Sequence, residues 1–225
     1  MSARDAILGK VRRSLAAGAE DAQRRSAVAA RLSDHPRGVV PKRGHLPKDE
    51  RIALFEEQAV KANATVAHVA GYGDLPEAVS SFLRDKNLPA AVRMGADPRL
   101  ASAPWAGQKT LEIHHGASDG EDASGVSHAF AGIAETGTLA LTSGQDNPTT
   151  VNFLPENHIV VVAASDVLPD LETVWQNLRA ARGTTGMPRT VNLVTGPSRS
   201  GDIEQVLLLG AHGPRALHIV IVDEA

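Results

Sequence analysis

The sequence contains no cysteine, very few aromatic residues and no long hydrophobic run. Without cysteine, the chain cannot supply a disulfide, a cysteine nucleophile or a Cys-ligated iron–sulfur or zinc site. Because aromatic residues make up only 3% of the chain, the core must be built from valine, leucine, isoleucine and alanine. No apolar run approaches the roughly 18 residues that indicate a membrane-spanning helix.

The charge balance and the first residues argue against further classes of protein. The formal net charge is −3 over 225 residues, which gives no electrostatic reason to expect binding to nucleic acid or to a membrane surface. The opening stretch MSARDAILGKVRRSL lacks the apolar centre and cleavage site of a secretory signal. These features predict a cytoplasmic protein, and the length suits one α/β domain with an appendage.

The appendage is predicted to be residues 1–47, a helix followed by an arm. Ser2 and Asp5 have the spacing of a capping box, and apolar residues then recur on one helical face as far as Leu15. Residues 18–48 are rich in alanine, arginine, glycine and proline and show no sustained period, so they are interpreted as an extended arm or as a loosely packed helix followed by a linker. The helix is interpreted either as an appendage that packs on its own domain or as a docking element for a partner.

The main domain is predicted to be residues 48–225, in which strands alternate with helices. The strands are predicted at 64–70, 90–94, 110–114, 158–165 and 190–195, with helices that begin near Pro47, Asp74 and Asp166. Such alternation is typical of an α/β fold in which helices flank a mostly parallel sheet. The run at 158–165 is apolar almost throughout, as expected for a strand covered on both faces.

Two stretches of the second half predict antiparallel pairing. Residues 129–144 contain two apolar runs on either side of a short polar turn, the pattern of a hairpin. The runs 206–210 and 216–223 are separated by only five residues. Because a parallel crossover needs about a dozen residues or more, these two runs are also predicted to form a hairpin. The sheet is therefore expected to be mixed, with antiparallel elements at its edges.

The turn AETGT (134–138) is the first candidate for chemistry. It contains Glu135, and Thr136, Gly137 and Thr138 beside it are candidate ligand-binding residues. A carboxylate at such a turn has the chemistry of a general base or a nucleophile, which makes Glu135 a candidate catalytic residue. The alternative is that the acid and the threonine hydroxyls only hydrogen-bond the turn.

The stretch PTTVNFLPENH (148–158) is the second candidate. It precedes the buried strand, and its two prolines stiffen a segment that offers uncharged hydrogen-bonding groups. Stiff polar loops beside strands are common places for ligands in α/β proteins. Asn152 is therefore a candidate ligand-binding residue, with an ordinary turn residue as the alternative.

The loop GPSRSGD (196–202) is the third candidate, and it follows a predicted strand. Its candidate ligand-binding residues are Gly196, Ser198, Arg199, Ser200 and Asp202. Glycine lets a backbone approach a ligand closely, and a guanidinium offers two parallel donors to a carboxylate or a phosphate. We expect this loop to meet the AETGT turn at the carboxyl edge of the sheet and to form one anion-binding pocket. In the alternative, Arg199 pairs with Asp202 or Glu204 and only braces the loop.

The histidines do not form a metal-binding pattern. His114 and His115 are adjacent, so on a strand they point to opposite faces and make a poor chelate. His212 lies in the glycine-rich AHGPR loop and is added to the candidate ligand-binding residues. Because the chain also lacks a dinucleotide-binding fingerprint, we expect no metal and no cofactor bound to this chain.

Four stretches taken in order resemble the lactate utilization protein C family, whose core is the LUD domain. They are AETGT, PTTVNFLPENHIVVV, GPSRSGDIE and GAHGPRALHIVIVDE, and the resemblance covers about residues 50–225. One departure is Gly201, where that family usually has alanine. The resemblance implies an α/β fold similar to the sugar-phosphate isomerase and CoA-transferase (NagB/RpiA-like) superfamily.

The resemblance also implies a role in oxidising L-lactate to pyruvate beside two iron–sulfur partner proteins. In that arrangement the iron–sulfur clusters belong to the partners, which agrees with the absence of cysteine here. Two functions are therefore considered. The chain is a subunit of such a system that binds a small anion or organises the partners, or it is a stand-alone isomerase or acyl/CoA-transfer type enzyme that uses Glu135 on an anionic metabolite.

Overall fold

The computed structural model of the chain describes residues 2–14, 22–183, 186–203 and 206–224. Contacts between residues divide it into two units, Met1–Val39 and Val40–Ala225. The first unit contains α1 (Ala3–Ser14) and α2 (Ala22–Asp34). The predicted capping box of α1 is confirmed, because the Asp5 N–H donates to the Ser2 hydroxyl and the Ser2 N–H donates to the Asp5 carboxylate, each at 3.2 Å.

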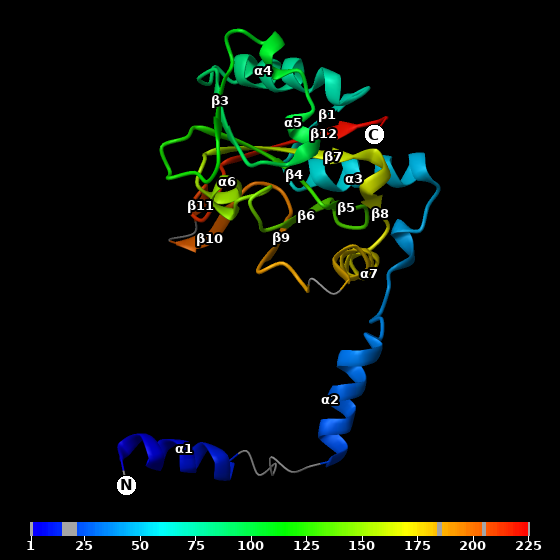
Figure 1. Cartoon of the computed structure of the whole chain (residues 1–225), viewed down its shortest axis with the longest axis vertical. Helices are drawn as coiled ribbons and strands as arrows, with labels where there is room; N and C mark the ends of the chain where they lie inside the picture. The colour runs from blue at the N-terminus through cyan, green and yellow to red at the C-terminus, as the bar shows by residue number, and fades with distance from the viewer. Residues whose placement is uncertain (1, 15–21, 184–185, 204–205, 225) are drawn as a thin grey trace. The chain divides into compact units, whose positions relative to one another are not determined.

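The second unit is built around a six-stranded sheet in which all strands are parallel (Figure 1). Their order is β1-β12-β7-β4-β2-β3. The bounds are β1 (Thr65–Val69), β2 (Ala91–Met94), β3 (Glu112–His115), β4 (Ser124–His128), β7 (Asn157–Ala163) and β12 (Ala216–Val222). The predicted α/β class with a mostly parallel sheet is therefore confirmed.

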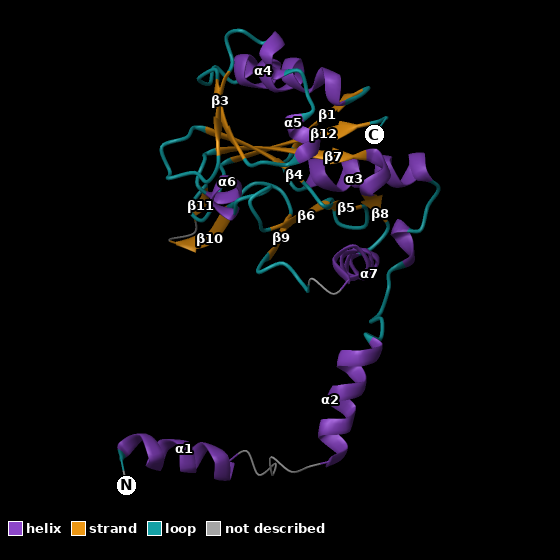
Figure 2. Cartoon of the chain, in the orientation of Figure 1, coloured by secondary structure: helices purple, strands orange, loops and turns teal. Residues whose placement is uncertain are grey.

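The central strand β7 carries a continuous apolar run because both faces of the sheet are covered (Figure 2). Val160 and Val162 of β7 face a cluster with Phe55 of α3 (Lys48–Lys61). The alternate residues Ile159 and Val161 face a second cluster that contains α4 (Leu75–Asp85). Each of these four β7 side chains is fully buried, so burial on both faces explains a run without polar alternation.

A second, four-stranded sheet has the order β8-β5-β6-β9. Its strands are β5 (Ala131–Ile133), β6 (Thr138–Thr142), β8 (Val167–Leu168) and β9 (Val191–Val194), and α7 (Leu171–Arg182) packs on one of its faces. The predicted hairpin in 129–144 is confirmed as the antiparallel pair β5–β6. β9 pairs antiparallel with β6 and β8 pairs parallel with β5, so this second sheet is mixed.

Two predictions about the second half are wrong. The helix expected from Asp166 begins at Leu171, where the Asp170 carboxylate accepts from the Thr173 N–H at 2.7 Å and provides the N-cap. The runs 206–210 and 216–223 do not pair with each other. β11 (Val206–Leu209) pairs with β10 (Arg199–Ile203), whereas β12 enters the main sheet between β1 and β7, so no crossover within one sheet is needed.

Short elements complete the description. They are α5 (Pro98–Ala101), α6 (Thr149–Phe153) and the 3-10 helices η1 (Lys42–Gly44), η2 (Tyr72–Asp74), η3 (Trp105–Gly107) and η4 (Ala164–Asp166). Each helix in the described ranges is too short or too polar to span a bilayer.

Limited proteolysis tests the predicted boundary between the appendage and the main domain. We expect the first cuts within residues 18–48, because this stretch is aperiodic and rich in small and basic residues. The expected product is a stable fragment that retains the parallel sheet, identified by mass spectrometry. First cuts within 129–225 would instead show that the main domain is not the more resistant part.

Candidate functional site

A cavity of about 390 Å³ lies between α6, the loop after β9 and the start of β12. We call it the amino-edge pocket, because His158 and Leu217 in its wall stand at the amino ends of β7 and β12. Five predicted ligand-binding residues line it, namely Asn152, Gly196, Ser198, Arg199 and His212. The structure thus brings together side chains from three stretches that the sequence singled out separately.

The pocket lies at the opposite edge of the sheet from the predicted one. The loop 196–202 does follow a strand, but β9 belongs to the second sheet, where it pairs antiparallel with β6. The carboxyl-edge rule applies to parallel strands, so it does not place this loop. The prediction of a carboxyl-edge position is therefore wrong for the loop, although its residues do line a cavity.

A buried chain of hydrogen bonds orients Asn152. The Ser127 hydroxyl donates to Asn152 Oδ1 at 2.7 Å, and Ser127 Oγ lies 3.0 Å from His158 Nε2. Since the hydroxyl hydrogen is used toward Asn152, the serine oxygen accepts the hydrogen on His158 Nε2. Burial lowers the pKa of His158 to about 3, so the ring is neutral near pH 7. Asn152 Nδ2 is buried and has no hydrogen-bond partner.

Hydrogen bonds to backbone atoms hold the loops of the pocket together. The Ser198 N–H donates to the Pro214 carbonyl at 2.8 Å, and Ser198 Oγ accepts from the His212 N–H at 3.2 Å. Arg199 Nη2 donates to the Ala62 carbonyl at 2.9 Å. These bonds fix the walls of the pocket before any ligand binds, which reduces the entropic cost of binding.

The polar lining of the pocket is rich in donors and free of acids. Its polar side chains are Asn152, His158, Thr195, Ser198, Arg199 and His212. Within the described residues, no aspartate or glutamate lines the pocket, and Arg199 forms no ion pair. A guanidinium beside an unpartnered amide N–H favours a ligand with acceptor oxygens and negative charge.

Glu135 does not belong to this pocket, which corrects the expected meeting of the AETGT turn with Arg199. Its Oε1 accepts from the Leu171 N–H at 3.3 Å, at the start of α7, where a negative charge is stabilised by the helix dipole. Thr136 and Thr138 share a hydroxyl contact of 2.7 Å, and Thr138 is 2.6 Å from Thr195. The turn therefore reaches the pocket only indirectly, through Thr195.

Two predicted ligand-binding glycines instead allow close packing of backbone. A Cβ on Gly137 would lie 2.2 Å from the Ala59 nitrogen, and a Cβ on Gly196 would lie 2.0 Å from the Ala62 carbonyl oxygen. Both glycines have positive φ angles, +64° and +69°. Their lack of a side chain brings the hairpin and the pocket loop against the end of α3.

The remaining predicted residues lie in β10. Ser200 is half-buried there and does not line the pocket. Asp202 belongs to the same strand, but its side chain lies outside the described residues, as does that of Glu204.

A second candidate site lies at the carboxyl edge of the main sheet, between β2 and β4. The chain leaves β2 toward β3 on one side, whereas β4 leads on to β7 on the other side. Adjacent parallel strands whose connections depart in opposite directions create a crevice, and α/β proteins commonly bind ligands there. Asp97 and Arg99 follow β2, and His128 ends β4.

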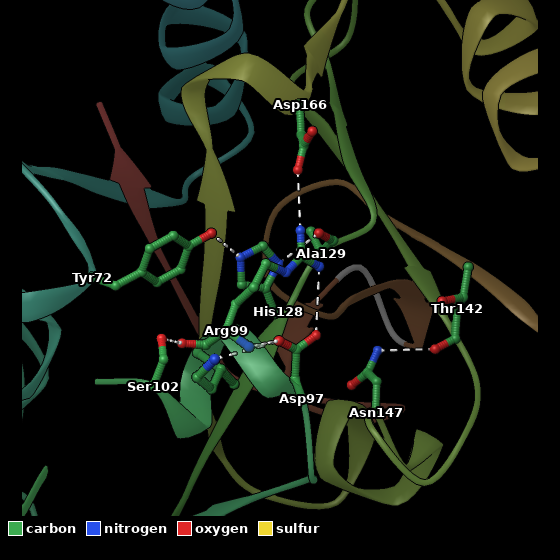
Figure 3. Close-up of polar contacts among 10 residues, drawn as sticks. Tyr72, Asp97, Arg99, Ser102, His128, Ala129, Thr142, Asn147 and Asp166 are labelled. Carbon is green, nitrogen blue, oxygen red and sulfur yellow. Dashed lines mark hydrogen bonds and ion pairs between the residues drawn. The ribbon is translucent and has the colours of Figure 1, made fainter. Parts of the chain in front are cut away.

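His128 is held in a defined neutral form at this edge (Figure 3). Its Nδ1 lies 2.8 Å from the Ala129 carbonyl and therefore donates, while Nε2 accepts the Tyr72 hydroxyl at 2.8 Å. Burial, together with the nearby charge of Arg99, lowers the pKa of His128 to about 4. Burial also raises the pKa of Tyr72. Near pH 7 both groups are uncharged.

Arg99 is clamped between two carboxylates in the same view. Its Nη1 donates to Asp166 at 3.2 Å and its Nη2 donates to Asp97 at 3.5 Å. The other oxygen of Asp97 accepts from the Arg99 N–H at 2.9 Å and caps α5. Burial raises the pKa of Asp166, and Arg99 opposes this effect.

A hollow of about 140 Å³ adjoins these residues, and we call it the switch-point hollow. Its wall comprises Asp97, Arg99, His128, Phe130, Thr142, Ser143, Gly144, Asp146, Asn147 and Arg182. Our sequence reasoning missed this site. Applied to the predicted strand 90–94, the carboxyl-edge rule would have pointed to the sequence GADPR and hence to Asp97 and Arg99.

Neither site has the donor set of a metal centre. Across the described ranges, no group of three or more His, Asp or Glu side chains is arranged to hold a metal ion. What the two sites offer is hydrogen bonding and fixed charge.

Comparisons with known proteins agree with the fold. The LUD domain family matches residues 121–222. Lactate utilization protein C of Geobacillus kaustophilus is 32% identical over 171 residues, which cover 72% of this chain and 69% of that protein. Its counterpart in Halalkalibacterium halodurans is 38% identical over 102 residues, 44% of each chain. The aligned part thus spans less than half the length of several of these curated relatives.

A solved structure is also similar. A DUF162 family protein from Deinococcus radiodurans superimposes with a TM-score of 0.57 at 22% identity, over 79% of this chain and 99% of that chain. At this identity the likeness shows a shared fold.

Proposed function

The chain belongs to the lactate utilization protein C family, and on that premise we propose that it binds a small carboxylate in the amino-edge pocket as a subunit of a lactate-oxidising system. The family supports a place in lactate utilization. The binding role and the subunit role are the new elements of the proposal.

One observation carries the binding role. Asn152 Nδ2 is a buried donor without a partner, in the wall of a cavity whose charged lining is cationic. An unsatisfied buried polar group costs about 1–3 kcal/mol, so the site is stabilised when a ligand oxygen accepts this hydrogen bond. A 2-hydroxy or 2-keto carboxylate offers such oxygens together with a charge for Arg199.

The subunit role follows from the chemistry that this chain does not supply. Removing two electrons from lactate requires an acceptor, and the chain has no cysteine to hold an iron–sulfur cluster. We propose that iron–sulfur partner proteins carry the redox groups, that this chain binds no cofactor of its own, and that the system is cytoplasmic. The partner proteins would then receive electrons while this subunit holds or delivers the carboxylate.

The alternative of a stand-alone isomerase or acyl-transfer enzyme relies on Glu135. The location of Glu135 gives it no support, because that carboxylate lies against the start of α7 and away from the lining of both sites.

Calorimetric titration of the full chain with L-lactate and with pyruvate tests the binding role. We expect Arg199→Ala to weaken binding about ten- to a hundredfold, because a hydrogen bond to a charged group is worth roughly 1.5–3 kcal/mol. Arg199→Lys is expected to weaken binding too, since an ammonium does not reproduce the planar fork. Asn152→Asp places a carboxylate where the ligand charge would lie and should weaken binding at least as much.

Arg215→Ala is the matched control, because Arg215 is an exposed arginine near the same edge that does not line the pocket. Thermal melts establish that each variant is folded. If the three pocket variants bind both carboxylates as tightly as the parent, the pocket assignment is wrong. If they bind weakly but a reconstituted system oxidises lactate at the parental rate, the subunit does not act by presenting the carboxylate.

A further inference from the structure

The amino-edge pocket has an unpartnered hydrogen-bond donor in its wall, Asn152 Nδ2, whereas the switch-point hollow has an unpartnered acceptor, Asn147 Oδ1. We propose that it is a second binding site, and that its ligand is a small uncharged molecule with hydroxyl groups, such as a short diol. This site is independent of the carboxylate pocket, since no residue lines both cavities.

Its place in the fold is the first argument. Asp97 and His128 come from the ends of β2 and β4, the adjacent strands whose connections run to opposite sides of the sheet. A crevice at the carboxyl ends of such strands is where doubly wound α/β proteins bind ligands. The hollow of about 140 Å³ is several times the roughly 30 Å³ that one water molecule occupies in the liquid.

The side-chain oxygen of Asn147 is a hydrogen-bond acceptor without a partner. Asn147 is 5% exposed and lines the hollow. Its Nδ2 donates to the Thr142 carbonyl at 3.3 Å, while its Oδ1 is buried and accepts no hydrogen bond. In Figure 3 this amide oxygen points away from Thr142. A buried acceptor of this kind is satisfied by a ligand that donates a hydrogen bond, and a hydroxyl does so.

The charged side chains around the hollow do not favour an anionic ligand. Arg99 is already shared by Asp97 and Asp166, so its positive charge is more than balanced. Asp146 and Arg182 also line the hollow. His128 adds no charge, because its Nδ1–H donates to Ala129 and its Nε2 accepts from Tyr72. The two acids of the lining balance its two arginines, and Asp166 binds Arg99 from outside the lining, so no excess positive charge favours an anion.

A small neutral ligand with hydroxyl groups suits the position of the hollow, its unpartnered acceptor and its balance of charges. One hydroxyl donates to Asn147 Oδ1, and its own oxygen remains free to accept a hydrogen bond. Thr142 and Ser143 also line the hollow, and Ser143 Oγ accepts from the Thr190 N–H at 2.9 Å. Propane-1,2-diol is a suitable probe, because it has the carbon skeleton of lactate with an alcohol in place of the carboxylate.

Nuclear magnetic resonance on the full chain tests the proposal with two probes. Propane-1,2-diol is expected to shift the Asn147 side-chain amide and the His128 ring signals in a saturable way. L-Lactate over the same range should leave these signals in place. Asn147→Ala should weaken diol binding about two- to tenfold, the value of one neutral hydrogen bond. Asn152→Asp, in the other pocket, should leave diol binding unchanged.

Any of three results would overturn the proposal. The first is that the shifts of the Asn147 and His128 signals do not saturate with the diol, and the second is that lactate shifts these signals at a lower concentration than the diol does. The third is that a high-resolution structure of crystals grown with the diol shows only ordered water on Asn147 Oδ1. The mapping on the parent protein decides the question even if Asn147→Ala does not fold. Failure of lactate to bind at Arg199 would leave these diol results unaffected, so the two proposals are tested separately.

Discussion

Acidification from pH 6.5 to pH 4.5 is expected to remove most of the stability of the main domain. Three buried histidines, His128, His158 and His218, must stay neutral in the folded state, because burial lowers their pKa values to about 4, 3 and 4. In the unfolded chain these groups take up protons near pH 6.5. Below that pH the unfolded state therefore binds more protons, and stability falls as the pH falls.

The size of this effect follows from proton linkage. Each such group lowers the free energy of unfolding by about 1.4 kcal/mol per pH unit, so three groups give up to about 4 kcal/mol per unit between pH 6 and pH 4. Natural domains have about 5–15 kcal/mol in all. Urea unfolding measured at half-unit steps of pH would show the slope directly.

Three other groups also affect how the free energy of unfolding depends on pH. The pKa of His68 is lowered by burial but raised more by its contacts with Asp223 and Glu56, so it favours the folded state below its raised pKa and offsets part of the loss. The raised pKa of Asp166 acts in the same stabilising direction at the acid end. Asp122, whose lowered pKa reflects Arg93 and Ser118 acting against burial, adds to the loss only below its ordinary pKa near 3.8.

A histidine variant tests the assignment. His158→Gln retains an N–H donor for Ser127 but cannot take up a proton, so the slope should fall by about 1.4 kcal/mol per pH unit. His114→Gln, at a half-exposed position on β3, is the control and should leave the slope unchanged. A parent protein whose stability is flat between pH 6.5 and 4.5 would contradict the role of all three histidines.

Replacing Gly137 by valine is expected to prevent stable folding. Any Cβ at this position would lie 2.2 Å from the Ala59 nitrogen and 2.5 Å from the Gln58 carbonyl carbon, both of which are backbone atoms of α3. A left-handed φ of +64° adds about 1–2 kcal/mol for a residue with a side chain. The helix would have to move away from the hairpin and expose the cluster around Phe55, so a loss above about 4 kcal/mol is expected.

Gly196→Ala should act in the same way, because its Cβ would meet the Ala62 carbonyl oxygen. Gly201→Ala is the control, since a Cβ there meets nothing within 4 Å, and its effect should stay within about 0.5 kcal/mol. Urea unfolding of the three variants gives the comparison. A Gly137→Val protein with a parental unfolding midpoint would show that the hairpin does not depend on this close approach.

The sequence predicted the elements whose local pattern was strong. The apolar run 158–165 and the hairpin in 129–144 carry their own signals, in continuous burial and in turn chemistry. β4 was missed because its sequence is SGVSH. It is buried through hydrogen bonds of Ser127 and His128, and a hydropathy pattern does not register that kind of burial.

Pairing between distant strands was beyond local reasoning. Nothing in the run 216–223 tells that it enters between β1 and β7, because partner choice depends on residues more than 50 positions away. Asn152, Arg199 and His212 of the amino-edge pocket could be predicted because each stands in a polar stretch of sequence next to a predicted strand. Their meeting at the amino edge follows from β9 joining the second sheet, which the loop sequences do not encode.

The insertion of β12 beside β1 has a consequence for how the protein is made. Thr65 pairs with His218, 153 residues later in the chain. At about 5–20 residues per second, the ribosome needs roughly 8 to 30 s to synthesise the chain between these partners. During that interval β1 has no neighbour in its sheet, and its exposed edge is a template for pairing with other nascent chains. Until β12 emerges, β1 is therefore a segment of the nascent chain at which pairing with another chain can begin.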